Sequence, residues 1–186
     1  MQKVLLVGSA PYSPHWWAKH GDSFDQAHCL NNAIRVVGQK HATWYVSEDF
    51  LWSQNYDMRR VTGVDTDHFR GFRMCASYLH RPHWYSCHYN GTMVVNAAYD
   101  ILNKATLHGI ATELNLVGCD MDYSKPETHF YDGGTPDPAR IPEDVMRGHL
   151  MKLRADFEPM HRIVTLGPKP SILPFPHGDP ELVWST

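Results

Sequence analysis

The sequence lacks the features of a membrane-spanning, nucleic-acid-binding or disulfide-stapled protein. No apolar run approaches the roughly 18 residues that a membrane-spanning helix needs. The 17 basic and 20 acidic residues leave a net charge of −3, which argues against general electrostatic binding of nucleic acid. The four cysteines form no C-x-x-C pair, and there is no internal repeat. We therefore expect reduced thiols in a cytoplasmic protein without a membrane span.

What is present is an ordinary globular composition. The 186 residues are 42% hydrophobic and 20% charged, which suits one domain that buries its core without a metal ion or a disulfide. We expect a single nucleotide-binding domain over residues 1–186. Within it, residues 167–186 contain five prolines and are expected to form an extended tail at the surface. The composition is consistent with a monomer or an oligomer.

Six short segments are predicted to form strands, each followed by small or polar residues. They cover residues 3–7, 25–30, 42–46, 71–76, 112–117 and 162–166. A continuous run such as 3–7 is typical of a strand that is buried on both faces, as in parallel sheets. The first run also reads as a strand rather than as a secretion signal, because its apolar part is too short.

The clearest helical pattern begins at Met93, with Asn90 or Thr92 as the N-cap and Gly109 as the stop. Two further helices are predicted near Pro14 and over residues 143–157. A helix between two strands is the unit of a parallel crossover. The alternation predicts an α/β fold, a single Rossmann-like domain with a mostly parallel sheet flanked by helices.

The first candidate site residues follow the strand at residues 3–7. In open α/β sheets, ligands bind at the carboxyl ends of the strands. Gly8, Ser9 and Ala10 are small enough for the backbone to approach a ligand, and their N–H groups suit a phosphate. The stretch matches neither G-x-G-x-x-G nor G-x-x-x-x-G-K-[ST], so a plain tight turn is the alternative.

Two polar pairs occupy comparable places. Asn31 and Asn32 follow the strand at residues 25–30 and offer amides to a base, a ribose or a sugar hydroxyl. A turn or a cap is the alternative for both. Gly91 and Thr92 precede the long helix, where a hydroxyl and the helix dipole suit an anion or a nucleotide. Simple helix capping is the alternative there.

Asp120 follows the strand at residues 112–117. A carboxylate at the carboxyl end of a central strand is a poor choice for packing alone, so we expect it to bind loops or a substrate hydroxyl. In a second interpretation, Asp120 and Asp122 form a D-x-D pair that holds a divalent cation on a diphosphate. The sequence leaves both interpretations open.

The segment around His129 has the composition of a catalytic loop. Histidine titrates near neutral pH, which suits His129 to the role of a general base. Tyr131 is placed to donate a hydrogen bond to a phosphate, and Arg140 to pair with one. The alternative for His129 is a structural histidine with satisfied hydrogen bonds.

A second histidine-rich stretch lies between the predicted strands. His80, His83, Cys87 and His88 supply enough nitrogen and sulfur for zinc, but their spacing matches no common zinc module. We expect a solvent-facing or substrate-lining aromatic loop instead. There is no G-x-S-x-G elbow, which argues against a serine nucleophile of that type.

Taken in chain order, these segments resemble the bacterial oligosaccharide sialyltransferases of glycosyltransferase family 42. The similar segments are residues 3–11 (the family's N-terminal strand and G-N-G-P-S turn), 24–32 (its F-D-x-x-x-x-N strand end), 91–92 (its S/T-S-G helix start), 116–120 (its L-x-G-x-D strand end) and 128–131 (its S-H-Y segment). Ser9 stands where the family has Asn, and Tyr12 where it has Ser. Residues 118–121 and 128–131 also look like a group of small uncharacterised bacterial and phage proteins.

The resemblance implies a Rossmann-like transferase with a CMP-sialic acid-like donor, a hydroxyl acceptor, and neither a metal ion nor another cofactor. The residues carried over by position are Gly8, Ser9 and Ala10 at the donor phosphate or ribose, Asn31 or Asn32 at the nucleotide or sugar, Gly91 and Thr92 at the cytidine, and His129 as the base that deprotonates the acceptor.

Two other functions are consistent with the same residues. One is a nucleotide pyrophosphokinase of the archaeal pterin type, which has related G-S-G-P-S and G-x-D features. It would need ATP and Mg²⁺, with Asp120 and Asp122 as ligands. The other is a non-catalytic nucleotide-binding or phage accessory protein, which would bind a ligand without turnover or bind none.

Overall fold

The computed structural model describes residues 1–37, 42–47, 71–75, 92–120, 142–169 and 171–184. The strands are β1 (Gln2–Val7), β2 (Gln26–Leu30), β3 (Ala42–Ser47), β4 (Gly71–Cys75), β5 (Thr112–Val117) and β6 (Arg162–Thr165). The helices are α1 (Ser13–His20), α2 (Ile34–Val37), α5 (Met93–Leu107) and α6 (Glu143–Phe157), with 3-10 turns η1 (Gly21–Ser23) and η2 (Asn31–Ala33). Each predicted strand is therefore confirmed, with its ends within one residue of the prediction.

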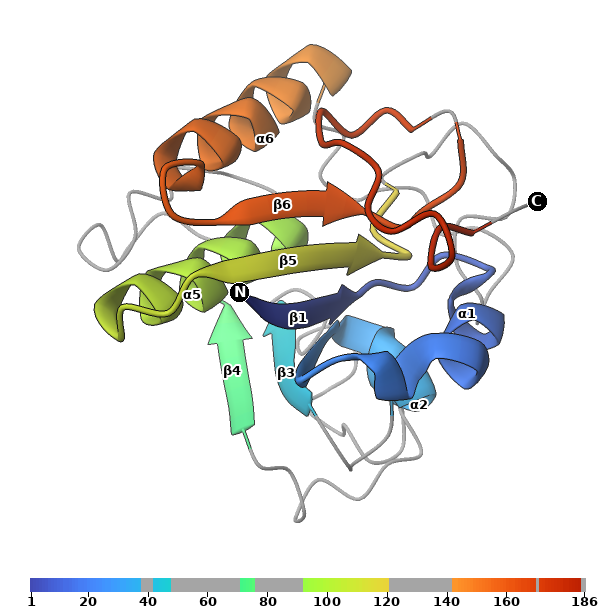
Figure 1. Ribbon diagram of the computed structural model, residues 1–186. Helices are drawn as coiled ribbons and strands as arrows, with labels where there is room; N and C mark the ends of the chain where they lie inside the picture. Colours follow the sequence, from blue (N-terminus) through green and yellow to red (C-terminus); the bar gives the residue numbers. More distant parts are fainter. Residues whose placement is uncertain (38–41, 48–70, 76–91, 121–141, 170, 185–186) are drawn as a thin grey trace.

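The strands form one six-stranded sheet in the order β4-β3-β2-β1-β5-β6, and every neighbouring pair is parallel. The chain first builds outward from β1 to β4 and then returns to add β5 and β6 on the other side of β1 (Figure 1). The predicted α/β fold is confirmed, and it is Rossmann-like. The point at which the strand order reverses lies between β1 and β5.

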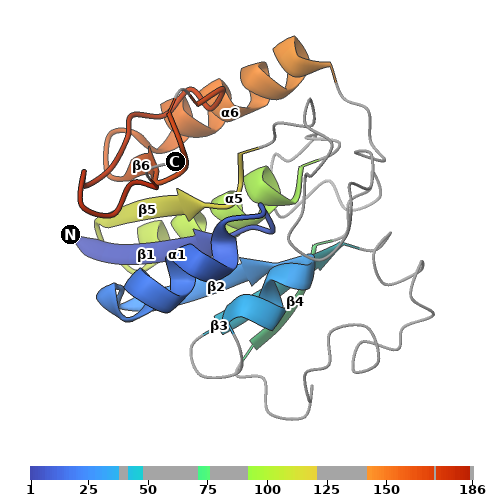
Figure 2. The same cartoon turned by 90° about the vertical axis from the view of Figure 1, so that its right-hand side faces the viewer.

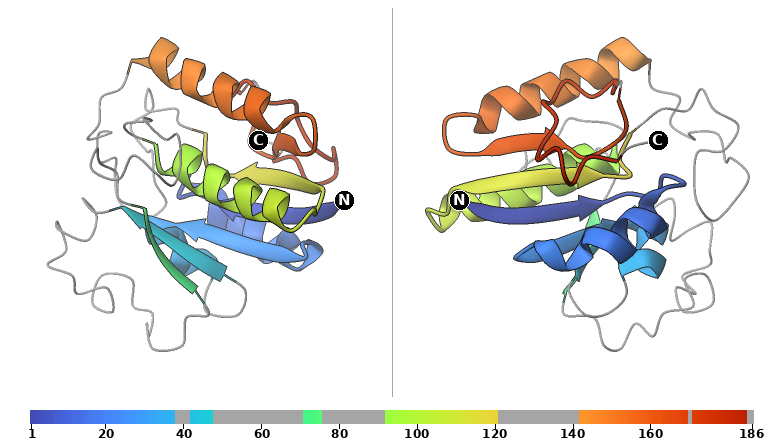
Figure 3. Two further views of the ribbon diagram at one scale, coloured as in Figure 1. Left: turned by 90° about the vertical axis from the view of Figure 1, so that its left-hand side faces the viewer. Right: turned by 45° about the vertical axis from the view of Figure 1, so that its right-hand side comes forward.

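Two hydrophobic cores lie on opposite faces of this sheet. Successive side chains of a strand point to opposite faces, so Val4 and Leu6 join the core under α5 and α6, whereas Leu5 and Val7 join the core under α1 and α2. The two views of Figure 3 bring each helical layer in turn to the front. The continuous apolar run of β1 follows from this arrangement, because both of its faces are covered.

Local signals account for the ends of α5. The Thr92 side chain accepts a hydrogen bond of 3.3 Å from the N–H of Val95, so Thr92 is the N-cap. Gly109 follows the C-cap with a φ of 65°, a left-handed conformation that favours glycine. Both predicted ends of this helix are confirmed.

The proline-rich tail does not lie only at the surface, as the sequence had suggested. Leu173 and Phe175 are buried in the core under α5 and α6, and His177 forms a parallel bridge with Thr165 of β6. Residues 182–184 then pack against the core on the opposite face. The tail therefore passes around the free edge of β6 (Figure 2). It covers part of an edge strand whose backbone groups would otherwise be unpaired.

Within the described ranges, no helix is long and apolar enough to cross a lipid bilayer. Cys29 and Cys119 are buried free thiols, and burial raises the pKa of both above the ordinary cysteine value. These two cysteines therefore behave as small buried hydrophobes.

A buried polar cluster joins β2, β3 and α5. The Tyr45 hydroxyl donates a 2.7 Å hydrogen bond to Asp100, and Lys104 pairs with the same carboxylate oxygen. The ring of His28 lies 5.8 Å from the Tyr45 ring, and its two buried nitrogens have no hydrogen-bond partner among the described residues. Burial, and then the charge of Lys104, lowers the pKa of His28 to about 4, against the opposing effect of Asp100.

This cluster predicts an acid-sensitive fold. Because the pKa of His28 in the folded state is below its ordinary value of 6.5, its contribution to stability is full above pH 6.5 and is lost as the pH falls towards about 4. The loss amounts to at most about 3 kcal/mol. Urea unfolding across this pH range should give a shallower decline for His28→Leu than for the wild type.

The control is His15→Gln, at an exposed position on α1. It should keep the wild-type decline in the free energy of unfolding. A His28→Leu profile that parallels the wild type would show that another group causes the acid sensitivity.

Candidate functional site

Four of the predicted site residues lie along one rim of the sheet. Gly8, Asn31 and Asp120 follow the carboxyl ends of β1, β2 and β5, and all strands of the sheet point the same way. Helix α5 returns towards the start of β5, so Thr92 at its beginning lies towards this same rim. Their placement agrees with the prediction, whereas their roles in binding stay predictions.

The ends of β1 and β5 meet at the point where the strand order reverses. The N–H of Gly8 donates to the carbonyl oxygen of Val117 at 2.8 Å, and the N–H of Ala10 donates to that of Gly118 at 3.1 Å. A Cβ atom on Gly8 would collide with the Gly118 carbonyl, and Gly118 itself has a φ of 65°. Close packing of the two strand ends is thus sufficient to explain the glycine at position 8.

Asp120 is held at this point by a tyrosine that the sequence analysis did not select. The Tyr12 hydroxyl donates a 2.6 Å hydrogen bond to Oδ1 of Asp120 and accepts one of 3.0 Å from the N–H of Gly118. Burial, and then the charge and hydrogen bond of Asp120, raise the pKa of Tyr12 above its ordinary value. The hydroxyl therefore stays protonated and remains a donor.

Two neighbouring elements complete this group. A Cβ atom on Gly167, just after β6, would lie 2.5 Å from Oδ1 of Asp120 and 2.9 Å from the Tyr12 hydroxyl. The Trp184 ring stacks on the Tyr12 ring, with centroids 5.3 Å apart and planes inclined by 18°. We call Tyr12, Gly118, Asp120, Gly167 and Trp184 the switch-point cluster, since they gather where the strand order reverses.

The two predicted asparagines differ in burial and in the contacts that they make, and their role in binding stays a prediction. Asn31 lies in a turn, with a φ of 42°, and its backbone carbonyl oxygen accepts a 2.7 Å hydrogen bond from Nε1 of Trp44. Asn32 is only 5% exposed, and its side-chain oxygen is buried without a hydrogen-bond partner among the described residues. Thr92 is likewise buried and caps α5.

Several predicted residues lie outside the part of the chain that the structure describes. They are Gly91, Asp122, His129, Tyr131, Arg140 and the stretch 80–88. Among the residues that are described, no group of three or more His, Cys, Asp or Glu side chains could hold a metal ion.

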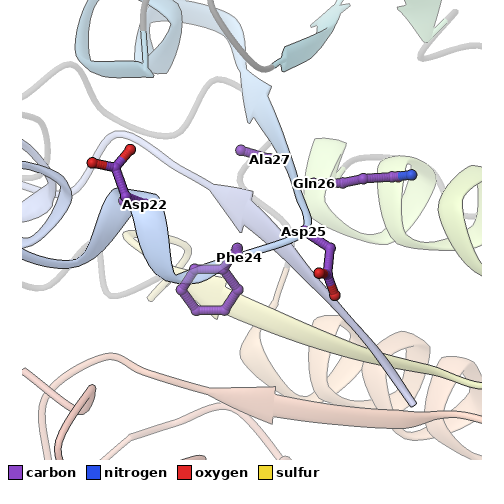
Figure 4. Close-up of a pocket in the computed structure, with 6 residues that line it drawn as sticks. Asp22, Phe24, Asp25, Gln26 and Ala27 are labelled. Atoms are coloured by element: carbon purple, nitrogen blue, oxygen red, sulfur yellow. The ribbon is translucent and has the colours of Figure 1, made fainter.

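A small hollow, open to solvent, lies at the opposite rim of the sheet (Figure 4). Its lining comes from the turn before β2 and the start of β2, namely Gly21, Asp22, Phe24, Asp25, Gln26 and Ala27. Asp25 already accepts a 2.9 Å hydrogen bond from the N–H of Lys3. The hollow is therefore far from the carboxyl ends of the strands and is not the predicted site.

Comparison of the chain with protein families, with curated proteins and with solved structures found no match in any of the three. The chemistry of the candidate site therefore rests on its own residues. It consists of a carboxylate with a fixed hydrogen-bond donor, at the place where parallel α/β sheets bind ligands.

The contacts of the switch-point cluster predict that removal of the Tyr12 hydroxyl lowers the free energy of unfolding measurably. Tyr12→Phe takes the donor from Asp120 and the acceptor from the Gly118 N–H in a largely buried place, so it should destabilise the fold by about 1–3 kcal/mol. Urea unfolding measures this change as a lower midpoint with an unchanged slope.

Tyr99→Phe is the matched control. It removes a hydrogen bond of 2.5 Å to Asp156, whose side chain is 32% exposed and also pairs with Lys152. Water replaces such a bond more easily, so the loss should stay below about 1 kcal/mol. Equal losses in the two variants would contradict the importance of the Tyr12 hydroxyl.

Proposed function

We propose that this protein is a glycosyltransferase that uses a nucleotide-activated sugar, of the CMP-sialic acid type, bound at the carboxyl ends of β1 and β5. The observation that carries the proposal is the Asp120 carboxylate, held by Tyr12 where the strand order reverses. Open parallel sheets bind nucleotides at such points. The resemblance of the strand-end segments to sialyltransferases supplies the choice of donor.

In the proposed reaction, an acceptor hydroxyl attacks the anomeric carbon of the donor sugar. His129 takes the hydroxyl proton, the new bond from oxygen to carbon forms, and the bond from carbon to the phosphate oxygen breaks with CMP as the leaving group. Tyr131 or Arg140 steadies the negative charge on the departing phosphate. The reaction is a direct displacement and involves no covalent intermediate with the protein.

The residues along the described rim would bind the donor. The N–H groups of Gly8 and Ala10 already donate to the carbonyls of Val117 and Gly118, so the remaining backbone groups of residues 8–10 would face the phosphate or ribose. Thr92 begins the helix that would lie nearest the cytidine. Asp120 accepts a hydrogen bond from a hydroxyl group of the sugar nucleotide. This role suits an ionised carboxylate, which accepts hydrogen bonds and donates none. The Tyr12 hydroxyl supports this role, since it fixes the carboxylate before the ligand arrives.

A ligand panel tests the donor class. CMP and CMP-linked sugars should raise the melting temperature in a thermal-shift assay, since a ligand at 100 times its Kd adds about 2.7 kcal/mol. Asp120→Asn should reduce this rise, because it replaces one acceptor oxygen with a donor. Asp22→Asn, at the hollow on the opposite rim, is the control and should keep the full rise.

No stabilisation by any nucleotide or nucleotide sugar would refute the proposal. Stabilisation by ATP that requires Mg²⁺, and that Asp122→Asn abolishes, would instead establish the pyrophosphokinase alternative. Stabilisation without any turnover would identify a nucleotide-binding protein that is not an enzyme.

A second experiment tests the base. The purified protein should hydrolyse a CMP-linked sugar slowly and transfer the sugar to a hydroxyl acceptor, and EDTA should leave both rates unchanged. His129→Ala should lower the transfer rate by about 10²-fold or more while nucleotide binding persists. His15→Ala serves as the control, and an equal rate for His129→Ala and the wild type would remove His129 from the mechanism.

A further inference from the structure

The C-terminal segment 179–184 is docked firmly beside the switch-point cluster. The N–H of Trp184 donates a 2.9 Å hydrogen bond to the carbonyl of Leu166, the residue that follows β6. Nε1 of Trp16 donates one of 2.6 Å to the carbonyl of Leu182. The N–H groups of Leu182 and Val183 both donate to the carbonyl of Asp179, which closes the segment into a turn. The backbone of Trp184 is therefore fixed relative to both β6 and α1.

From Trp184, a continuous chain of contacts leads to the candidate site. Its ring stacks on the Tyr12 ring at 5.3 Å and 18°, and a nearly parallel stack defines the plane of the tyrosine. The Tyr12 hydroxyl then reaches Oδ1 of Asp120 at 2.6 Å and the N–H of Gly118 at 3.0 Å. The two hydrogen bonds are directional and the stack fixes the face of the ring, so the tryptophan is connected to the carboxylate through one side chain.

We propose that Trp184 is a positioning residue for Asp120, acting through Tyr12. The link from Trp184 through Tyr12 to Asp120 is argued from the contacts alone. The importance of this link for binding a sugar nucleotide rests on the proposed function.

The surroundings of Tyr12 and Trp184 indicate that the two rings orient the Tyr12 hydroxyl and do not only fill space in the core. Gly167 has no side chain, and a Cβ atom there would press on both Asp120 and the Tyr12 hydroxyl. Tyr12 and Trp184 both remain partly exposed, and they lie beside the hydrophobic core rather than within it. The geometry thus holds one hydroxyl against one carboxylate at the edge of the protein.

The test follows the Asp120 carboxyl group directly, in full-length protein labelled with ¹³C-aspartate. Its resonance is assigned as the one lost in Asp120→Asn. Tyr12→Phe should shift it, because the hydrogen bond is removed. Trp184→Leu should shift it in the same direction, and Trp184→Phe, which keeps an aromatic ring, should return it towards the wild-type position.

Two controls separate positioning from general loosening of the fold. Trp17→Leu removes an indole that packs against the same hydrophobic core, and it should leave the resonance in place. In a Tyr12→Phe background, Trp184→Leu should add no further shift, because the link is already cut. If Trp184→Leu does not fold, Trp184→Met, which has a flexible apolar side chain and no ring, takes its place.

An unmoved Asp120 resonance in the Trp184→Leu variant would overturn the inference, as would a further shift in the Tyr12→Phe background.

Affinity for a CMP-linked sugar gives the second measurement. Trp184→Leu should weaken it roughly tenfold, about the value of one hydrogen bond to a charged group, and Trp184→Phe should restore it. If the resonance responds as expected but no nucleotide binds, the proposed function fails and the positioning role of Trp184 stands.

Discussion

The close approach of β1 and β5 at Gly8 and Gly118 is the constraint on which the rest of the site depends. A side chain at Gly8 would collide with the Gly118 carbonyl, so the two strand ends meet backbone to backbone. That contact brings the loop after β1 across the end of β5, where the Tyr12 hydroxyl reaches both the Gly118 N–H and Asp120. The glycines in these two turns therefore serve the packing of the strands first, and through it they place the carboxylate.

Local patterns in the sequence were sufficient to predict the sheet. Strands covered on both faces favour uninterrupted apolar runs, and β1 has one over residues 4–7. In β5 the apolar residues are interrupted by Glu113 and by the buried Asn115. Caps and stops such as Thr92 and Gly109 act over three or four residues, and they too could be read directly. The carboxyl ends of parallel strands share one rim, so the common placement of Gly8 and Asp120 followed from the fold alone.

The contacts within the site could not be predicted in the same way. Tyr12 and Asp120 are 108 residues apart in the chain, and no local pattern indicates that a tyrosine in a proline-containing turn will hold a carboxylate after a distant strand. The tail was misjudged for a related reason, because its prolines exclude a helix but say nothing of burial. Leu173 and Phe175, between those prolines, are the apolar side chains that enter the core.

The bond between Trp16 and Leu182 joins residues that are 166 positions apart. During synthesis the amino-terminal strands and α1 leave the ribosome long before the tail. Until the tail follows, the Trp16 indole lacks its contact with Leu182. Domains with many contacts of large sequence separation fold more slowly, because a long loop must close before such a contact forms. The nascent chain is thus able to build its central sheet early, while the region around Asp120 is completed only when the tryptophan at position 184 has emerged.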